Sequence, residues 1–225
     1  MFVSKQAIME FDPNNPVIKL CVEGMNAEGE GNIAEAQRLF QQAWDMAGND
    51  FEKFTAAHYL ARNQEDPNDN LKWNLAALTH ANAIKGDGLQ GHYPSLYLNV
   101  GKSYETLRDM EEAARYYQSA ADSSADLPAG KYTDMIRSGV SAGLQRVGKA
   151  APMDEAVTQL IERWCERKDL KPLTTVLPAY VGYLGTENDR NKLLSAFSYL
   201  SAMRCLDEEE QGMVEGVVKR LGTSL

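Results

Sequence analysis

One-sided stripes of apolar residues run through the C-terminal half of the chain. Residues 207–221 carry such a stripe, and their other face is charged; the stripe consists of Met213, Val214, Val217, Val218 and Leu221. Residues 130–148 carry a similar stripe of Ile136, Gly139, Val140 and Leu144. Steps of three and four positions are the period of an amphipathic α-helix. Two further helices are predicted at 153–167 and 189–204.

Residues 172–185, PLTTVLPAYVGYLG, give a mixed pattern. Their β-branched and aromatic side chains favour a strand, and Pro178 would interrupt a helix. Because no other segment offers a partner strand, we predict a short or kinked helix here. The last helix is predicted to begin at Asp207 as N-cap, with Glu210 in the capping-box position, and to close the fold as a terminal cap.

Two N-terminal segments share a pattern of small and aromatic residues. Residues 17–43 carry Gly24, Ala36, Phe40 and Ala43, and residues 94–121 carry Gly101, Ala113, Tyr117 and Ala120. Each residue of the first set lies 77 positions before its counterpart in the second. Small residues let two helices approach closely, and the rings of Phe40 and Tyr117 are expected to fill the gap toward the next hairpin. Each segment is therefore predicted to form a helical hairpin.

A third hairpin is predicted between these two. FEKFTAAHYLARNQ and LKWNLAALTHANAIK are interpreted as its helices, with Ala76, His80 and Ala83 on the packing face of the second. The acidic segment EDPNDN between them is rich in turn-forming residues and is interpreted as an inserted turn.

Helix-start signals support this register. Asn32 and Asp109 are each followed by a Glu three positions later, which is the spacing of an N-cap with its capping-box partner. Prolines stand where first helical turns should begin, at Pro16, Pro94 and Pro172. The sequence thus predicts ten or eleven helices, paired into five hairpins.

The hairpin pattern of residues 94–121 resembles the tetratricopeptide repeat (TPR), a helix-turn-helix unit of about 34 residues. Tyr97, Val100-Gly101 and Tyr104 occupy the helix A positions of the family pattern, and residues 16–44 are similar. The remainder matches only by its rhythm of helices. The resemblance implies an all-α fold: a right-handed superhelical solenoid of about five helix-turn-helix hairpins with a C-terminal capping helix.

The resemblance also implies a domain organisation. A tail, residues 1–15, would precede one TPR-like repeat domain at 16–222. Its repeats are expected near 16–48, 50–86, 94–127, 130–168 and 172–204, with the cap at 207–221.

Charge and cysteine content narrow the function classes. The chain of 225 residues has 23 Lys and Arg against 32 Asp and Glu, a formal net charge of −9. This balance argues against nucleic acid and anionic membranes as partners. Three widely spaced cysteines without a CxxC motif argue against a zinc or dithiol site and fit a reducing compartment. Without a signal peptide or a long apolar run, we expect a cytoplasmic location and no membrane insertion.

Candidate binding residues follow from the resemblance. In this family, helix A side chains line a concave groove that binds peptides. The positions that fall there include Met25, Tyr59, Arg62, Asn99, Lys102 and Arg137. Some relatives clamp a C-terminal carboxylate with Lys and Asn, but Ile18 and Val22 occupy those positions of the first repeat, so we do not expect that ligand. The resemblance implies a non-catalytic adaptor or scaffold for a protein or peptide partner, with no cofactor and no metal.

Three alternatives remain open. A regulatory sensor for a peptide or small ligand would need a deep, closed pocket. A helical enzyme would need several of His58, Asp66, Glu105 and Arg137 to converge in one cleft. A homodimer through the C-terminal half would need exposed apolar residues there, such as Tyr180, Tyr183 and Leu184.

Two isolated residues are interpreted as structural. His80 occupies the aromatic position of a helix B, which indicates a core side chain. Cys165 lies between Arg163 and Arg167, which could lower its thiol pKa, but no histidine is near in sequence and a buried structural cysteine is expected.

Overall fold

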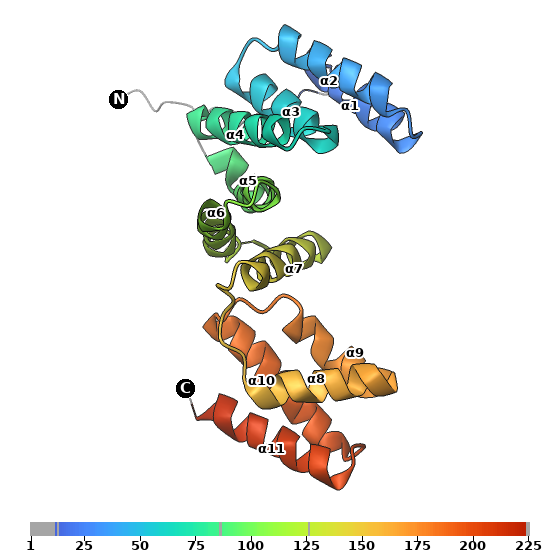
Figure 1. Ribbon diagram of the computed structural model, residues 1–225, viewed down its shortest axis with the longest axis vertical. Coiled ribbons are helices and arrows are strands. Elements are labelled where there is room, and N and C mark those ends of the chain that lie inside the picture. The colour runs from blue at the N-terminus through green and yellow to red at the C-terminus, as the bar shows by residue number, and fades with distance from the viewer. Residues whose placement is uncertain (1–11, 13, 86, 126, 224–225) are drawn as a thin grey trace, which may run out of the picture. The chain divides into compact units, whose positions relative to one another are not determined.

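The computed structural model describes residues 12, 14–85, 87–125 and 127–223. Over these residues the chain is all-helical, with eleven α-helices and two short 3-10 segments (Figure 1). The chain folds into two compact units, Met1–Leu127 and Pro128–Leu225. The division falls after Leu127, and the two units are described in turn.

The first unit contains three helical hairpins. Their helices are α1 (Pro16–Gly29), α2 (Ile33–Met46), α3 (Asp50–Leu60), α4 (Pro67–Ala83), α5 (Tyr93–Thr106) and α6 (Met110–Ser123), with 3-10 segments η1 (Ala61–Asn63) and η2 (Asp87–His92). Each helix packs on the next one along the chain, and α1 also packs on α3. These bounds confirm the helices predicted for this half of the sequence.

The outer hairpins have the close helix approach predicted for their small residues, and the rings of Phe40 and Tyr117 lie against the glycines of their own hairpins. A Cβ atom on Gly24 would overlap the Phe40 ring, and one on Gly101 would lie 2.7 Å from Cδ1 of Tyr117. Phe40 and Tyr117 are both fully buried. A glycine at these two positions therefore sets the distance between α1 and α2 and between α5 and α6.

The middle hairpin differs from its prediction. The buried residues of α4 include Asn74, Leu78 and Ala81, whereas Ala83 is exposed. His80 is not a core side chain: its Nδ1 lies 2.8 Å from Oδ1 of Asp50 at the surface. The packing positions predicted for α4 are wrong because EDPNDN was interpreted as a turn, whereas it contains the start of the helix. Its Asp66 caps α4, and its proline occupies the first turn.

The observed buried residues of α4 have the same spacing as the buried residues of α2 and α6. Asn74, Leu78 and Ala81 have the spacing of Ala36, Phe40 and Ala43 and lie 38 positions after them. They lie 39 positions before Ala113, Tyr117 and Ala120. The 77-residue interval is therefore divided into two steps of similar length, 38 and 39 residues.

The second unit is built around one core. Its helices are α7 (Lys131–Arg146), α8 (Glu155–Arg167), α9 (Leu170–Tyr180), α10 (Glu187–Met203) and α11 (Glu208–Gly222). Helices α8 to α11 pack in a closed circuit, because α11 also contacts α8. Trp164, Phe197 and Leu160 are fully buried in the core that these four helices share.

Two sequence predictions in this unit have different outcomes. Residues 170–180 form α9 with Pro178 inside it, which confirms a short helix there. Cys165, by contrast, is exposed and not buried as expected. The inward face of α8 is already occupied by Leu160, Ile161 and Trp164, so the next residue along the helix faces solvent.

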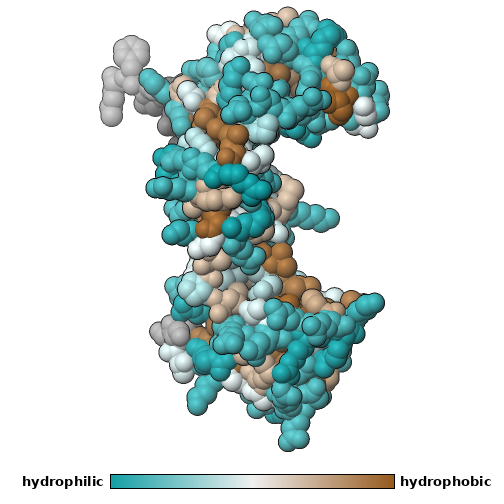
Figure 2. All heavy atoms as spheres, in the orientation of Figure 1, coloured by the Kyte–Doolittle hydropathy of each residue, from teal (hydrophilic) through white to brown (hydrophobic). Residues whose placement is uncertain are grey.

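The visible surface is mainly hydrophilic, with small hydrophobic areas between the hydrophilic ones (Figure 2). Across the described residues, none of the helices combines the length and the apolar character needed to cross a membrane. Asp207 caps α11 and Asp109 caps α6, both as predicted.

Candidate functional site

The first unit has a polar hollow of about 340 Å³, lined by residues of α1, α3, η1, α4 and α5. Three predicted groove residues meet in it: Arg62 from η1, and Asn99 and Lys102 from α5. The remaining lining residues are Glu28, His58, Ala61, Asn70 and Asn74. The hollow thus combines two cations, one carboxylate and three amides.

The carboxylate holds one wall of the polar hollow in place. Oε2 of Glu28 forms an ion pair with the guanidinium of Arg62, with an N–O distance of 3.0 Å. Its Oε1 accepts a hydrogen bond from the Asn63 amide at 2.7 Å. Glu28 thereby ties α1 to η1 and keeps the guanidinium of Arg62, about half exposed, at the rim.

A buried amide network connects α4 with α5 beneath the hollow. The Asn74 amide donates to Oγ of Ser103 at 2.9 Å and to Oδ1 of Asn70 at 3.1 Å. The Ser103 hydroxyl donates to the same Asn70 oxygen at 2.6 Å. Because these groups satisfy one another, they position α5, whose Lys102 is exposed and whose Asn99 is half-buried at the hollow.

A second hollow, of about 320 Å³, lies between α3, η2 and α5. We call it the aromatic hollow; its lining residues are Phe51, Phe54, Thr55, His58, Tyr59, Gly88, Leu89, His92, Ser95 and Leu96. Phe54, Leu89 and Leu96 are buried and give it an apolar base. The Phe54 ring meets the His92 ring edge-on, with centroids 6.0 Å apart.

His58 lines both hollows. Burial lowers its pKa to about 4, and the charges of Arg62 and His92 act in the same direction. The imidazole is therefore neutral at pH 7. Its Nδ1 is buried without a hydrogen-bond partner among the described residues.

Two other predicted groove residues lie beside these hollows in different roles. Tyr59 lines the aromatic hollow, and its ring stacks on Phe40 with centroids 5.3 Å apart. Burial raises the pKa of Tyr59. Met25 packs against the core cluster that contains Phe40 and Leu60 and lines neither hollow.

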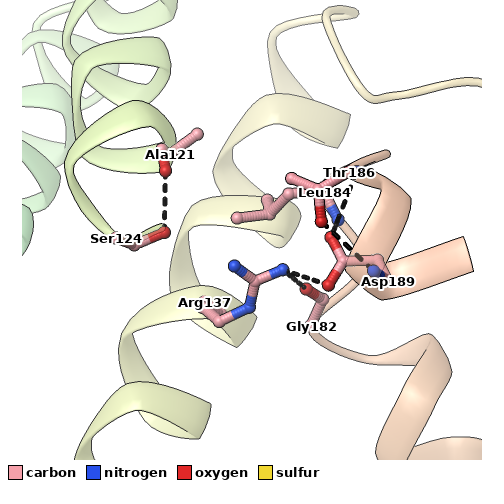
Figure 3. Close-up of polar contacts among 7 residues, drawn as sticks. All are labelled: Ala121, Ser124, Arg137, Gly182, Leu184, Thr186 and Asp189. Carbon is pink, nitrogen blue, oxygen red and sulfur yellow. Dashed lines mark hydrogen bonds and ion pairs between the residues drawn. The ribbon is translucent and has the colours of Figure 1, made fainter. Parts of the chain in front are cut away.

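Arg137 belongs to the second unit. Its guanidinium donates to Oδ1 of Asp189 at 2.5 Å and to the Gly182 carbonyl at 3.1 Å (Figure 3). The other carboxylate oxygen of Asp189 accepts from the backbone N–H groups of Leu184 and Thr186 at 3.0 and 3.3 Å. Both side chains are largely buried, so this pair holds α7 to the α9–α10 connection.

The four residues of the enzyme hypothesis occupy separate environments. His58 lies between the two hollows, Asp66 caps α4, and Glu105 accepts a hydrogen bond from the Tyr117 hydroxyl. Arg137 is paired with Asp189. Within the described part of the chain, no group of three or more His, Cys, Asp and Glu side chains could hold a metal ion.

The three apolar residues considered for a homodimer interface are not fully exposed. Tyr180 and Tyr183 pack against the core of the second unit and are partly buried, as is Leu184. The most exposed large apolar side chains of this unit are instead Leu170, Tyr199 and Met135. The structure therefore gives no exposed cluster of the three residues named from the sequence.

Sequence reasoning missed several residues of the two hollows. Asn70 and Asn74 lie on α4, the second helix of its hairpin, whereas the sequence analysis took candidate residues from the helices that it expected to come first in each hairpin. From the sequence, His58 was considered only as a candidate residue of a helical enzyme. Asparagines on the packing face of an amphipathic helix are the one sequence signal that could have identified the amide network.

No protein-family model matches the chain, and no curated protein is similar to it at a significant level. The fold and the two hollows are therefore the basis on which a function can be proposed.

Proposed function

We propose that the first unit is a non-catalytic adaptor that binds an extended segment of a partner protein in the polar hollow. The observation that carries this proposal is the meeting of Arg62, Asn99 and Lys102 in one hollow. Amide side chains hydrogen-bond an extended peptide backbone, and cations attract acidic side chains. Two cations against one carboxylate make this hollow locally basic on a chain of net charge −9.

We propose further that the hairpins belong to a TPR-like superhelix. The supporting features are the 38- and 39-residue spacing of corresponding packing residues and the glycine–ring contacts at Gly24 and Gly101. For residues 130–204, the assignment to repeats rests on the rhythm of helices alone. A cytoplasmic location is supported by three free cysteines, because free thiols persist in reducing compartments.

The test compares two triple variants of the full chain. Arg62→Ala, Asn99→Ala, Lys102→Ala removes two cations and one amide from the polar hollow. Arg38→Ala, Arg115→Ala, Gln118→Ala removes the same chemistry from exposed positions on α2 and α6. Circular dichroism establishes that both variants fold.

Each protein is used to capture partners from lysate of the source cells, and a captured partner is then titrated in purified form. The proposal expects the hollow variant to lose at least tenfold in affinity while the matched control binds like the wild type. A purified partner that binds both variants equally well contradicts it.

A further inference from the structure

The second unit has a hollow of its own, which we call the mixed-charge hollow. Its volume of about 500 Å³ is within the range for ligand pockets, which is roughly 300–1,000 Å³. Its lining residues are Asp134, Arg137, Thr174, Leu177, Pro178, Ala179, Val181, Gly182, Asp189 and Lys192. They come from α7, from α9 with the residues that follow it, and from the first part of α10.

Helix α9 and its C-cap give this hollow an apolar wall. Thr174, Leu177, Pro178 and Val181 have the spacing of residues on one helix face. Pro178 is exposed and Val181 is 46% exposed, so the core of the unit does not cover them. A ligand with an apolar group can therefore bury this wall and gain the free energy of removing it from water.

The other lining helices bring charges of both signs. Asp134 and Arg137 are three positions apart on α7, and Asp189 and Lys192 are three positions apart on α10, so each two lie on one helix face. Arg137 and Asp189 neutralise each other in their ion pair (Figure 3). Asp134 and Lys192 are exposed, and neither side chain has an ion-pair or hydrogen-bond partner among the described residues. One carboxylate and one ammonium group therefore remain for a ligand.

This charge pattern narrows the class of ligand. Two carboxylates and two cations line the hollow, so its formal charge is balanced. A multivalent anion would be repelled by Asp134 and Asp189, and a polyamine would be repelled by Arg137 and Lys192. A purely apolar ligand would take charged groups out of water without replacing their hydrogen bonds. A small zwitterion with an apolar body satisfies both the charges and the wall.

We propose that the mixed-charge hollow binds a free α-amino acid with an apolar side chain. The ammonium group of the ligand pairs with Asp134, its carboxylate pairs with Lys192, and its side chain covers Leu177 and Pro178. Binding thus adds a link between α7 and α10 beside the Arg137–Asp189 pair. This site lies in the second unit and does not depend on the function proposed for the polar hollow.

The test titrates the full chain with three compounds of similar shape. L-leucine carries both charges, isocaproate lacks the ammonium group, and isoamylamine lacks the carboxylate. Amide NMR spectra at neutral pH should show shifts concentrated in α7, α9 and α10, and leucine should bind roughly tenfold tighter than either analogue. The proposal is overturned if leucine does not bind at millimolar concentration, if either analogue binds equally well, or if the shifts lie in the first unit.

Single substitutions assign the two charged partners. Asp134→Asn should bind leucine and isocaproate equally, because the variant no longer attracts the ammonium group. Lys192→Gln should lose most of the preference for leucine over isoamylamine. Both residues are exposed, so neither substitution should prevent folding. If both preferences survive these substitutions, the assignment of the hollow is wrong.

Two matched controls remove the same charges outside the hollow. Glu187→Gln removes a carboxylate from the first turn of α10, as Asp134→Asn does from the first turn of α7. Lys171→Gln removes an exposed ammonium group from α9. Neither residue lines the hollow, so both variants should bind leucine like the wild type. A loss in the controls as large as in the hollow variants would show a general charge effect and contradict the proposal.

Discussion

The two units of this protein use helices of similar length to build different interiors. In the first unit, packing follows the order of the helices, and small residues meet rings at Gly24 and Gly101. In the second unit, α8 to α11 close on one another around the fully buried Trp164 and Phe197. Sequential packing distributes the core among neighbouring hairpins, whereas closed packing concentrates the core in one place.

The two units also differ in where their polar and charged side chains lie. The first unit has its amides and cations beside two hollows, where a ligand can reach them. The second unit uses charged residues as clamps, such as Arg137 with Asp189 and Arg220 with Asp154 at 2.6 Å. Arg137 and Asp189 also line a hollow of about 500 Å³, beside Asp134 and Lys192, so the charged residues of this unit do not serve packing alone.

The largest expected effect is in the core of the second unit. Trp164→Ala removes a fully buried indole that packs against Phe197, and it should lower the free energy of unfolding of this unit by about 3–5 kcal/mol. Amide hydrogen exchange should accelerate in α8 to α11 and remain unchanged in α1 to α5. Trp164→Phe is the control and should cost much less. Equal acceleration in both units would show that they do not unfold as separate bodies.

The next effect concerns the buried ion pair. Asp189→Asn leaves the Arg137 guanidinium without its carboxylate and should cost roughly 2–4 kcal/mol in urea unfolding of the second unit. The double variant Arg137→Met, Asp189→Asn should recover part of this loss, because no unpaired charge remains buried. If the single variant is as stable as the wild type, the pair does not hold α7 in place.

A pH effect of similar or smaller size distinguishes the first unit. The pKa of His58 is about 4 in the folded chain and returns to about 6.5 on unfolding, so between these values the unfolded chain binds the additional proton. The free energy of unfolding of the first unit should therefore fall as the pH falls from 6.5 to 4, by up to about 3 kcal/mol. In His58→Leu this contribution should disappear from the pH dependence measured by urea titration. An identical pH dependence in the variant would rule out His58 as its source.

The smallest of these effects tests the close approach of α5 and α6. Gly101→Ala places a Cβ 2.7 Å from the Tyr117 ring and should destabilise the first unit by about 1–2 kcal/mol in thermal unfolding. The better helix propensity of alanine opposes this loss and limits its size. Gly29→Ala is a useful reference, because nothing lies within 4 Å of an added Cβ there. The interpretation is wrong if both variants change stability alike.

The sequence predicts what is local and periodic in this molecule. Helix positions, caps at Asp109 and Asp207, and the close helix approach at Gly24 and Gly101 depend on residues close in sequence or on a repeated spacing, and they are confirmed. The register of α4 was wrong because the same residues, DPN, serve equally as a turn or as a capped first helical turn. Local signals cannot separate these two conformations.

The site was predicted only in part for the same reason. Arg62, Asn99 and Lys102 could be placed together from the repeat pattern. The pairing of Arg137 with Asp189 joins residues 52 positions apart and has no spacing rule behind it. The role of His58 depends on its burial between two hollows, which no property of its neighbours in the sequence indicates.

The most direct test of the central claim is photo-crosslinking from single positions in living cells. A photoreactive amino acid is placed at position 99, in the polar hollow, and separately at position 118, on the exposed face of α6. The account predicts a protein partner crosslinked from position 99 and not from position 118. A partner crosslinked from position 118 and not from position 99 would contradict the assignment of the polar hollow as the binding site.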